Sequence, residues 1–187
     1  MKKRKDYQDY VIKDGKFLGN FEEMYEKVED PWNQSIEKNI EKSLSRQAVI
    51  NFIDRNDIKS LVEFGCGLGN TTNFLHSQSG IKITGLDISK SAIRKSKIKY
   101  PYLSFKVDNA LNVANYTHYD CIFFSEISWY LLEDKMLDNI FDKMNRFLKN
   151  KYFIHNLTFY KGQQKYGREY FTNLDEFIDF TPFEIQG

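Results

Sequence analysis

Short apolar runs recur along the chain from residue 61 onward, and helical patterns separate several of them. The runs span residues 61–64, 83–87, 103–107, 120–124 and 152–159. Apolar residues at three- and four-residue spacing predict helices over 89–99 and 136–148. Buried strands that alternate with helices are typical of a parallel sheet covered on both faces. The pattern therefore predicts an α/β fold, with a doubly wound, mostly parallel sheet in three layers, α/β/α.

The residues that precede the first run show a different pattern. Polar and aromatic residues mix over residues 1–34, and a short helix is predicted over 20–27 before Pro31 breaks the pattern. Ser35 is then a candidate N-cap for one long amphipathic helix, because apolar residues follow it at helical spacing. These apolar residues are Ile36, Ile40, Leu44, Ala48, Phe52 and Ile53.

Composition and charge narrow the class of protein. Hydrophobic residues make up 41% of the 187 residues, enough for one sizeable core, so we expect a single domain over 1–187. In it, an N-terminal lid and long helix (1–56) would precede a core (57–187). Cys66 and Cys121 lie in apolar runs, which favours reduced, buried thiols over a disulfide.

Charge and hydropathy also bear on the partners. Lys and Arg number 27 against 26 Asp and Glu, so the net charge of +1 gives no basic excess for binding nucleic acid. No apolar run approaches the roughly 20 residues that cross a bilayer. We expect a cytoplasmic protein that binds a small molecule, without nucleic acid, membrane or metal as partner.

Glycine and polar residues follow three successive strands at the point where each strand ends. In LVEFGCGLGNTT (61–72), Glu63 lies at the end of the first strand, and three glycines follow at every second position. These are Gly65, Gly67 and Gly69. Asp87 ends the second strand and can accept both hydroxyls of a ribose. Asp108 and Asn109 follow the third strand, where a polar pair can meet the edge of an adenine. Together these residues indicate an adenosine-shaped site.

The glycine spacing decides between adenosine cofactors. A dinucleotide fingerprint would need a glycine where the chain has Asn70, which disfavours a nucleotide-dependent dehydrogenase. The pattern E-x-G-x-G-x-G instead resembles motif I of the class I S-adenosylmethionine-dependent methyltransferases. The resemblance continues through Asp87 in GLDIS, Asp108 in VDNA and YDCIFFSEISWYLL (119–132), and it covers about residues 35–160. It implies S-adenosyl-L-methionine as cofactor and S-adenosyl-L-homocysteine as product.

The resemblance also implies roles for the strand-end residues. The glycine loop would pass the methionine portion of the cofactor, and Glu63 would organise the loop or the cofactor's ammonium group. Asp87 would hold the ribose hydroxyls, and Asp108 the adenine amino group. Further cofactor contacts would be Trp32, Ile88, Asn109 and Ser125. Plainer alternatives stay open, because glycines can serve packing alone and each aspartate can cap a helix.

Methyl transfer requires alignment of the reacting atoms, and a base where the nucleophile is a hydroxyl. Glu126, directly after the fourth strand, is the first candidate for a base or substrate anchor. His155, late in the fifth strand, is the second. A strand histidine is more often a core residue, and Glu126 can instead bind a cation of the acceptor. A sensor or scaffold subunit that binds S-adenosylmethionine without turnover is the alternative function.

Aromatic residues are candidates for the walls of the pocket. Trp32, in DPWNQS, would fold over the cofactor within the lid, where a ring face near a sulfonium is favourable. Candidate substrate contacts are Trp129, Tyr130, Tyr160 and Tyr166. The DPW stretch resembles small bacterial methyltransferases of the nodulation-factor N-methyltransferase group and of capsule or other surface-polysaccharide pathways.

The class of methyl acceptor is predicted from the fourth motif, which lacks the signature of enzymes that methylate DNA bases. Ser125 to Ser128 read SEIS, whereas relatives that methylate amines of DNA bases carry an Asn/Asp-Pro-Pro-Tyr type of motif. We therefore expect a small polar acceptor, such as a sugar, a nucleotide-linked sugar or a phosphoryl derivative. We expect methylation of an oxygen atom slightly more than methylation of a nitrogen atom.

The end of the chain looks short for this family. Complete domains have two further antiparallel strands, and FEIQG (183–187) leaves room for one at most. A minimal version, a truncated chain or a partner that supplies the edge would each account for this. An uncovered edge strand invites pairing, so a homodimer is a hypothesis.

Overall fold

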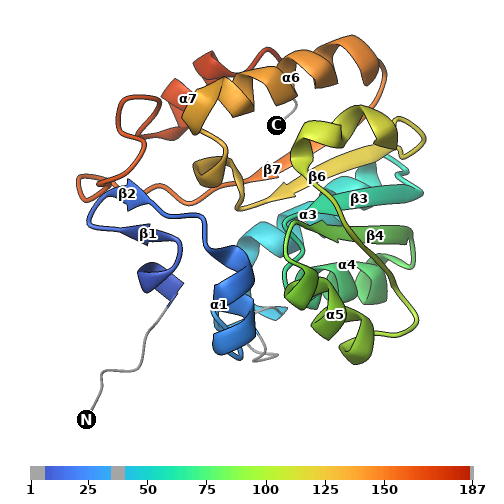
Figure 1. The fold of residues 1–187 in the computed structure, drawn as a ribbon. Coiled ribbons are helices and arrows are strands. Elements are labelled where there is room, and N and C mark those ends of the chain that lie inside the picture. The colour runs from blue at the N-terminus through green and yellow to red at the C-terminus, as the bar shows by residue number, and fades with distance from the viewer. Residues whose placement is uncertain (1–6, 35–40, 186–187) are drawn as a thin grey trace.

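A five-stranded parallel sheet forms the centre of the protein (Figure 1). The computed structural model describes residues 7–34 and 41–185. The strands are β3 (Ser60–Phe64), β4 (Lys82–Asp87), β5 (Ser104–Val107), β6 (Cys121–Ser125) and β7 (Tyr152–Asn156). They lie in the order β5-β4-β3-β6-β7. From β3 the chain adds β4 and then β5 on one side, and it then returns to place β6 on the other side of β3. In sheets of this kind a ligand crevice is expected where the strand order reverses, between β3 and β6. The predicted α/β fold class is confirmed.

One face of the sheet is covered by the helix that precedes β3 in the sequence and the helix that follows it. These are α3 (Leu44–Arg55) and α4 (Asn70–Ser79), which pack on Leu61, Ile83 and Phe123. Side chains alternate across a strand, so neighbours such as Val62 face the other side. Each face of the sheet therefore has its own apolar core.

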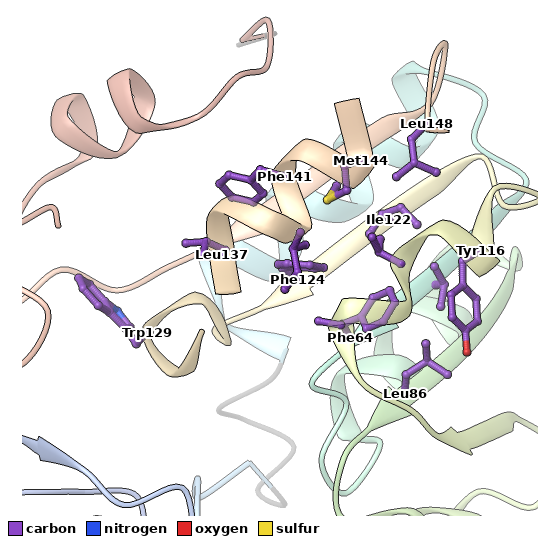
Figure 2. Close-up of a cluster of buried hydrophobic side chains, with 14 of the residues drawn as sticks. Phe64, Leu86, Tyr116, Ile122, Phe124, Trp129, Leu137, Phe141, Met144 and Leu148 are labelled. Atoms are coloured by element: carbon purple, nitrogen blue, oxygen red, sulfur yellow. The ribbon is translucent and has the colours of Figure 1, made fainter. Parts of the chain in front are cut away.

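The opposite face carries the larger core (Figure 2). Helix α6 (Met136–Phe147) lies across β6 with Leu137, Phe141 and Met144 buried in the same cluster as Phe124. This spacing of three and four residues is that of an amphipathic helix and matches the sequence prediction. The same cluster includes residues of the 3-10 helix η2 (Ala110–Tyr116) and of α7 (Leu174–Phe180).

Helix α5 (Lys90–Lys99) follows β4 and packs beside β5. Ser89 is the N-cap of this helix, and its hydroxyl accepts a hydrogen bond of 3.1 Å from the amide of Ala92. No helix in the described residues is long and apolar enough to span a membrane.

The described N-terminal residues form a small unit outside the central sheet (Figure 1). Its elements are η1 (Tyr7–Asp9), β1 (Ile12–Lys13), β2 (Lys16–Phe17) and α1 (Phe21–Lys27). Strands β1 and β2 pair only with each other, around Asp14 and Gly15, which both have positive φ. Helix α1 lies where the short helix was predicted, and it packs against α5.

Two sequence predictions differ from the structure. A single long helix from Ser35 is wrong, because Ser43 is extended (φ −71°, ψ 111°) and α3 begins only after it. Residues 35–40 of that prediction lie outside the described residues. Strand β7 ends at Asn156, before the predicted 159, because Thr158 turns to bond the Glu126 carboxylate. The described residues after α7, through 185, form no strand.

Candidate functional site

A cavity of about 970 Å³ lies at the carboxyl ends of β3, β4 and β6. The N-terminal unit closes one side of it, and the loops after β6 and β7 close the other. The sequence-predicted residues that line the cavity are Trp32, Gly65, Gly67, Asp87, Ile88, Asp108, Asn109, Ser125, Glu126, Trp129, Tyr130, Tyr160 and Tyr166. Those that do not are Glu63, Gly69 and His155. The cavity thus brings together candidates that lie more than 130 residues apart in the sequence.

The glycine loop needs glycine because other groups approach its backbone closely. Gly67 has φ +52°, and a Cβ on it would lie 2.6 Å from the Tyr25 hydroxyl. A Cβ on Gly65 would overlap a methyl group of Ile127. Gly69 faces the ring of Phe105 and caps α4, away from the cavity. The predicted cofactor contact at Gly69 is therefore not supported by its position, and packing accounts for this glycine.

Asp87 is anchored at the centre of the site. One carboxylate oxygen accepts the amide of Gly67 and the other accepts the amide of Ser89, both at 2.9 Å. The side chain is buried, and burial raises the pKa of Asp87 to about 6. Each oxygen has a further lone pair, so the carboxylate can still accept hydrogen bonds from two hydroxyls of a ligand.

Glu63 lies beneath the loop rather than at the cavity. Its Oε2 accepts a 2.5 Å hydrogen bond from the Thr72 hydroxyl on α4, and Oε1 has no partner among the described residues. Burial raises the pKa of Glu63 to about 7. Contact with a cofactor ammonium is not supported by this position. The carboxylate instead ties the loop to the start of α4, which was the other predicted role.

Arg46 of α3 lines the cavity and was missed by the sequence analysis. Its Nε donates to the Thr71 hydroxyl at 2.9 Å, and a second guanidinium nitrogen donates to Ser43 at 3.1 Å. Burial lowers the pKa of Arg46, and the negative charges of Glu63 and Glu126 oppose this effect. An arginine on an amphipathic helix gives no sequence signal, because only the packing of α3 on α4 turns it toward the site.

Asp108 and Asn109, which follow β5, hold the next segment of the chain by hydrogen bonds and also line the cavity. Asp108 accepts hydrogen bonds from Tyr116 at 2.5 Å and from Asn112 at 2.7 Å, and Asn109 accepts the amide of Leu111. Burial raises the pKa of Asp108, but these hydrogen bonds outweigh it and leave the pKa below its ordinary value. Asn109 thus caps the 3-10 helix η2, and Asp108 accepts hydrogen bonds from side chains of that helix, while both residues line the cavity.

The two candidate bases have different surroundings. Glu126, at φ +60°, lines the cavity, and its carboxylate accepts the amide and the hydroxyl of Thr158 at 3.0 and 3.1 Å. His155 does not line the cavity. Its Nε2 lies 2.6 Å from the Ser128 hydroxyl, its ring stacks on Phe177, and burial lowers the pKa of His155 to about 3. His155 is therefore a half-buried packing residue outside the cavity, and this position does not support its proposed catalytic role.

Aromatic rings from distant segments line the rest of the cavity. Tyr7 and Trp32 lie 5.0 Å apart between ring centroids, and Phe17 stacks on Tyr130 at 6.1 Å. Tyr7 of η1, Phe17 of β2, and Phe21 and Tyr25 of α1 also line the cavity and were not predicted, because the short elements that carry them gave no clear sequence pattern. Trp129 is 8% exposed and donates to the Thr158 carbonyl, so it serves the core as well as the wall.

No group of three or more His, Cys, Asp and Glu side chains within the described residues is arranged to hold a metal ion. The cavity instead offers backbone amides, carboxylates, phenols and aromatic faces. This set fits an organic ligand with hydroxyl groups and a flat base.

Comparison with known proteins adds to this geometry. Residues 61–151 match a family model described as a methyltransferase domain. No curated protein sequence matches the chain. Among solved structures, the chain is similar to the PH0226 protein from Pyrococcus horikoshii OT3, with 20% identity, a TM-score of 0.56 and coverage of 71% of this chain and 64% of that chain.

The chain is also similar to two further solved structures. DesVI from Streptomyces venezuelae is 11% identical, with a TM-score of 0.56 and coverage of 68% of this chain and 55% of that one. The sugar N-methyltransferase KedS8 from Streptoalloteichus sp ATCC 53650 is 14% identical, with a TM-score of 0.55 and coverage of 68% and 53%. The chain spans less than two thirds of the length of each structure, and such identities show the fold alone. Residues 61–151 are thus similar to a methyltransferase domain, and the chain shares the fold of these solved structures.

Proposed function

We propose that the protein transfers a methyl group from S-adenosylmethionine to a small polar acceptor. The observation that carries this proposal is the cavity beside Asp87 and the glycine loop, at the crevice where doubly wound sheets bind ligands. Its volume of about 970 Å³ lies near the upper end of the range of small-molecule sites, roughly 300–1,000 Å³. That volume leaves space for an acceptor beside the cofactor.

The lining residues give the cofactor an orientation. The methionine portion would follow Gly65 and Gly67, and the ribose hydroxyls would donate to Asp87. The adenine would lie between Ile88 and the polar pair after β5. This arrangement directs the sulfonium toward Ser125 at the end of β6, where the aromatic part of the cavity begins.

Methyl transfer requires that the reacting atoms be aligned and that a nearby group accept one proton from the acceptor. A lone pair of the acceptor attacks the methyl carbon, the bond from that carbon to sulfur breaks, and its electrons stay on sulfur in S-adenosylhomocysteine. The acceptor's proton would pass to Glu126, whose carboxylate is fixed by Thr158 and faces the cavity. A hydroxyl needs this base more than an amine does, so we place O-methylation slightly ahead.

Polar atoms near the aromatic wall support a polar acceptor. The hydroxyl of Tyr166 and Oε1 of Gln164 are buried without a partner in the described chain, and both residues line the cavity. An unpaired buried polar atom costs about 1–3 kcal/mol, which an acceptor that supplies the missing hydrogen bonds would recover. We infer a sugar, a nucleotide-linked sugar or a phosphoryl derivative, used in surface-polysaccharide synthesis. KedS8, by its name, acts on a sugar.

Calorimetric titration with S-adenosylmethionine and S-adenosylhomocysteine tests the cofactor site. Asp87→Asn keeps a side chain that can accept one of the two backbone amides but removes the charge. We expect it to weaken binding of both ligands at least about tenfold, or 1.4 kcal/mol. Absence of binding to the unaltered protein would reject the proposed function.

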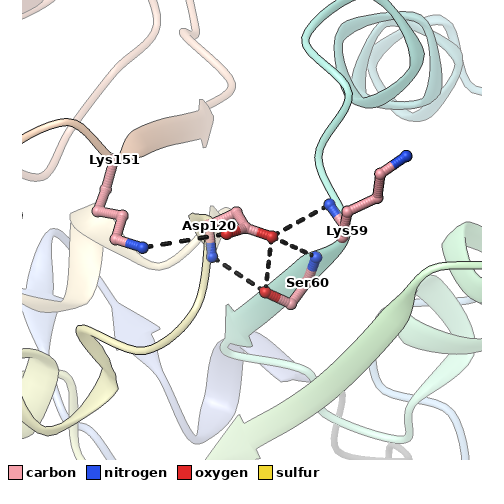
Figure 3. Close-up of polar contacts among 4 residues, drawn as sticks. All are labelled: Lys59, Ser60, Asp120 and Lys151. Atoms are coloured by element: carbon pink, nitrogen blue, oxygen red, sulfur yellow. Dashed lines mark hydrogen bonds and ion pairs between the residues drawn. The ribbon is translucent and has the colours of Figure 1, made fainter.

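Asp120, directly before β6, supplies a matched control outside the cavity, and Figure 3 shows its contacts. Its carboxylate accepts the amides of Lys59 and Ser60 at 3.1 and 2.9 Å and the Ser60 hydroxyl at 2.9 Å. Asp120→Asn therefore removes a similarly anchored charge where strands β3 and β6 begin. We expect its affinity for both ligands to stay unchanged. An equal loss in both variants would show that the effect comes from the fold.

One observation favours a second function, binding of S-adenosylmethionine without turnover. Thr158 already bonds both oxygens of Glu126, which leaves the carboxylate less available as a base. Incubation with methyl-labelled S-adenosylmethionine and a panel of sugars, nucleotide-linked sugars and sugar phosphates distinguishes the two functions. Transfer of label to any member supports the enzyme. Tight binding that depends on Asp87, with no transfer across the panel, supports the sensor.

A further inference from the structure

Glu22 of α1 makes a dense set of hydrogen bonds to the start of α5. Its Oε2 accepts the Ser89 hydroxyl at 2.6 Å, and its Oε1 accepts the Ser91 hydroxyl at 2.8 Å. The amide of Ser91 lies 3.1 and 3.2 Å from the two oxygens. A carboxylate is favoured here because the N-terminus of a helix presents unpaired amides and a partial positive charge. Glu22 thus joins two segments nearly 70 residues apart.

The partners of Glu22 belong to the anchor of the cofactor site. The amide of Ser89 donates to Asp87, and the other oxygen of Asp87 accepts the amide of Gly67. A single chain of hydrogen bonds therefore runs from α1 through Ser89 and Asp87 to the glycine loop. Movement of α1 away from α5 would break the first step of this chain.

Tyr25 of the same helix and Trp32, which follows the helix, lie near the glycine loop. Tyr25 is 3% exposed, and its hydroxyl lies against Gly67. Trp32 donates from Nε1 to that hydroxyl at 2.8 Å, and both rings line the cavity. Lys95 of α5 donates to the Tyr25 carbonyl and adds a second link between the helices. The rings of Tyr25 and Trp32 are held in place by contacts that begin at α1.

The N-terminal unit is attached to the rest of the protein by side chains. Its two strands pair with each other and add no hydrogen bond to the central sheet. A lone two-stranded hairpin is marginally stable in water, and units with few backbone links open at lower free energy than core strands. Contacts such as those of Glu22 therefore control how firmly the unit, residues 7–34, stays closed.

We propose that Glu22 is a positioning residue that latches the N-terminal unit over the cofactor site, so that cofactor entry and product release require this latch to open. The inference rests on the proposed function, because it takes the cavity beside Asp87 as the cofactor site. Glu22 does not line the cavity. It acts through Ser89 and Ser91 on one side and through Tyr25 and Trp32 on the other.

The first test is the rate of S-adenosylhomocysteine release, followed by stopped-flow tryptophan fluorescence. Glu22→Gln should speed both release and binding by about three- to tenfold, as expected for the loss of one or two hydrogen bonds to a partly exposed carboxylate. Glu23→Gln is the matched control, since Glu23 lies on the same helix and pairs with Lys27. Equal rates in the two variants would overturn the latch, as would a faster release with unchanged binding rate.

Coupling to the serines separates a latch from a general loss of stability. Ser91→Ala should also speed release, and adding Glu22→Gln to it should give much less than the product of the two effects. The thermal unfolding midpoint of each variant should stay close to that of the unaltered protein. Independent, multiplying effects would count against the proposal.

A second measurement does not depend on the ligand. Hydrogen exchange of the α1 amides in the free protein should become faster in Glu22→Gln than in Glu23→Gln, while exchange in β3 stays unchanged. Unchanged exchange in α1 would overturn the latch. Failure to bind S-adenosylhomocysteine, together with faster exchange in α1, would instead reject the proposed function and leave the latch as a structural contact.

Discussion

Glu63 and Asp87 are carboxylates that the fold buries at the ends of two neighbouring strands. Burial disfavours the charged form, and it raises the pKa of Glu63 to about 7 and that of Asp87 to about 6. Asp87 recovers part of this energy through two backbone amides, whereas Glu63 has one hydroxyl partner. The stability of the protein is therefore expected to depend on pH near neutrality.

The pH dependence is predicted most sharply for Glu63. Its pKa is raised above the ordinary 4.5, so its contribution to stability is complete below pH 4.5 and is lost as the pH rises to about 7. Glu63→Gln should therefore gain stability relative to the unaltered protein by up to about 3 kcal/mol between pH 5 and pH 8. Urea unfolding at both pH values measures this difference. The exposed Glu26→Gln should show no such trend, and parallel behaviour of the two variants would contradict the prediction.

At the scale of elements, helix α6 shows how the period of a sequence sets a packing face. Phe141 is 2% exposed and contacts the ring of Phe153 on β7, whereas Phe147 on the same helix is 57% exposed. The two residues have the same helix propensity, so a comparison of them isolates burial. The helix was predicted from spacing alone, and its buried face agrees with that prediction.

Substitution of these two phenylalanines tests the role of α6 in the core. Phe141→Ala should lower the free energy of unfolding by about 3–5 kcal/mol, because it removes a buried ring and leaves a cavity. Phe147→Ala should change it by less than about 1 kcal/mol. Chemical denaturation of both variants gives the two values. Similar losses would show that α6 does not cover the sheet in the way described.

At the scale of the whole molecule, the described sheet has two open edges, β5 and β7. The surroundings of β5 are more apolar at the surface, since Ile98, Tyr102 and Val107 are 72%, 67% and 47% exposed. Unpaired strand edges with apolar neighbours favour pairing with another chain. The β5 edge is thus the better candidate for the hypothesised homodimer.

Light scattering at micromolar concentration tests the dimer. We expect twice the chain mass of 22.2 kDa, and Val107→Lys should return the protein to one chain mass. Phe147→Lys, which places the same charge on an exposed site of α6, should leave the dimer intact. A single chain mass for the unaltered protein would reject the hypothesis.

The sequence by itself determined the sheet, helices α5 and α6, and the strand-end residues of the candidate site. Buried strands and amphipathic helices leave periodic patterns, and strand ends in a parallel sheet meet at one edge. Asp87 and Gly67 could therefore be placed together from their positions alone. Trp32 was predicted beside them from the DPWNQS stretch and from the favourable contact of a ring face with a sulfonium, because an isolated aromatic residue has no period.

Only the tertiary structure decided which candidates face the cavity and which face the core. Gly69 and His155 lie near the predicted edge of the sheet, yet the packing of Phe105 and Phe177 takes them away from the cavity. Arg46 and Glu22 reach the site region from helices whose orientation depends on contacts with distant segments. Strand and helix periods are local properties of the chain, whereas the direction of a side chain toward a shared cavity is set by contacts between segments far apart in the sequence.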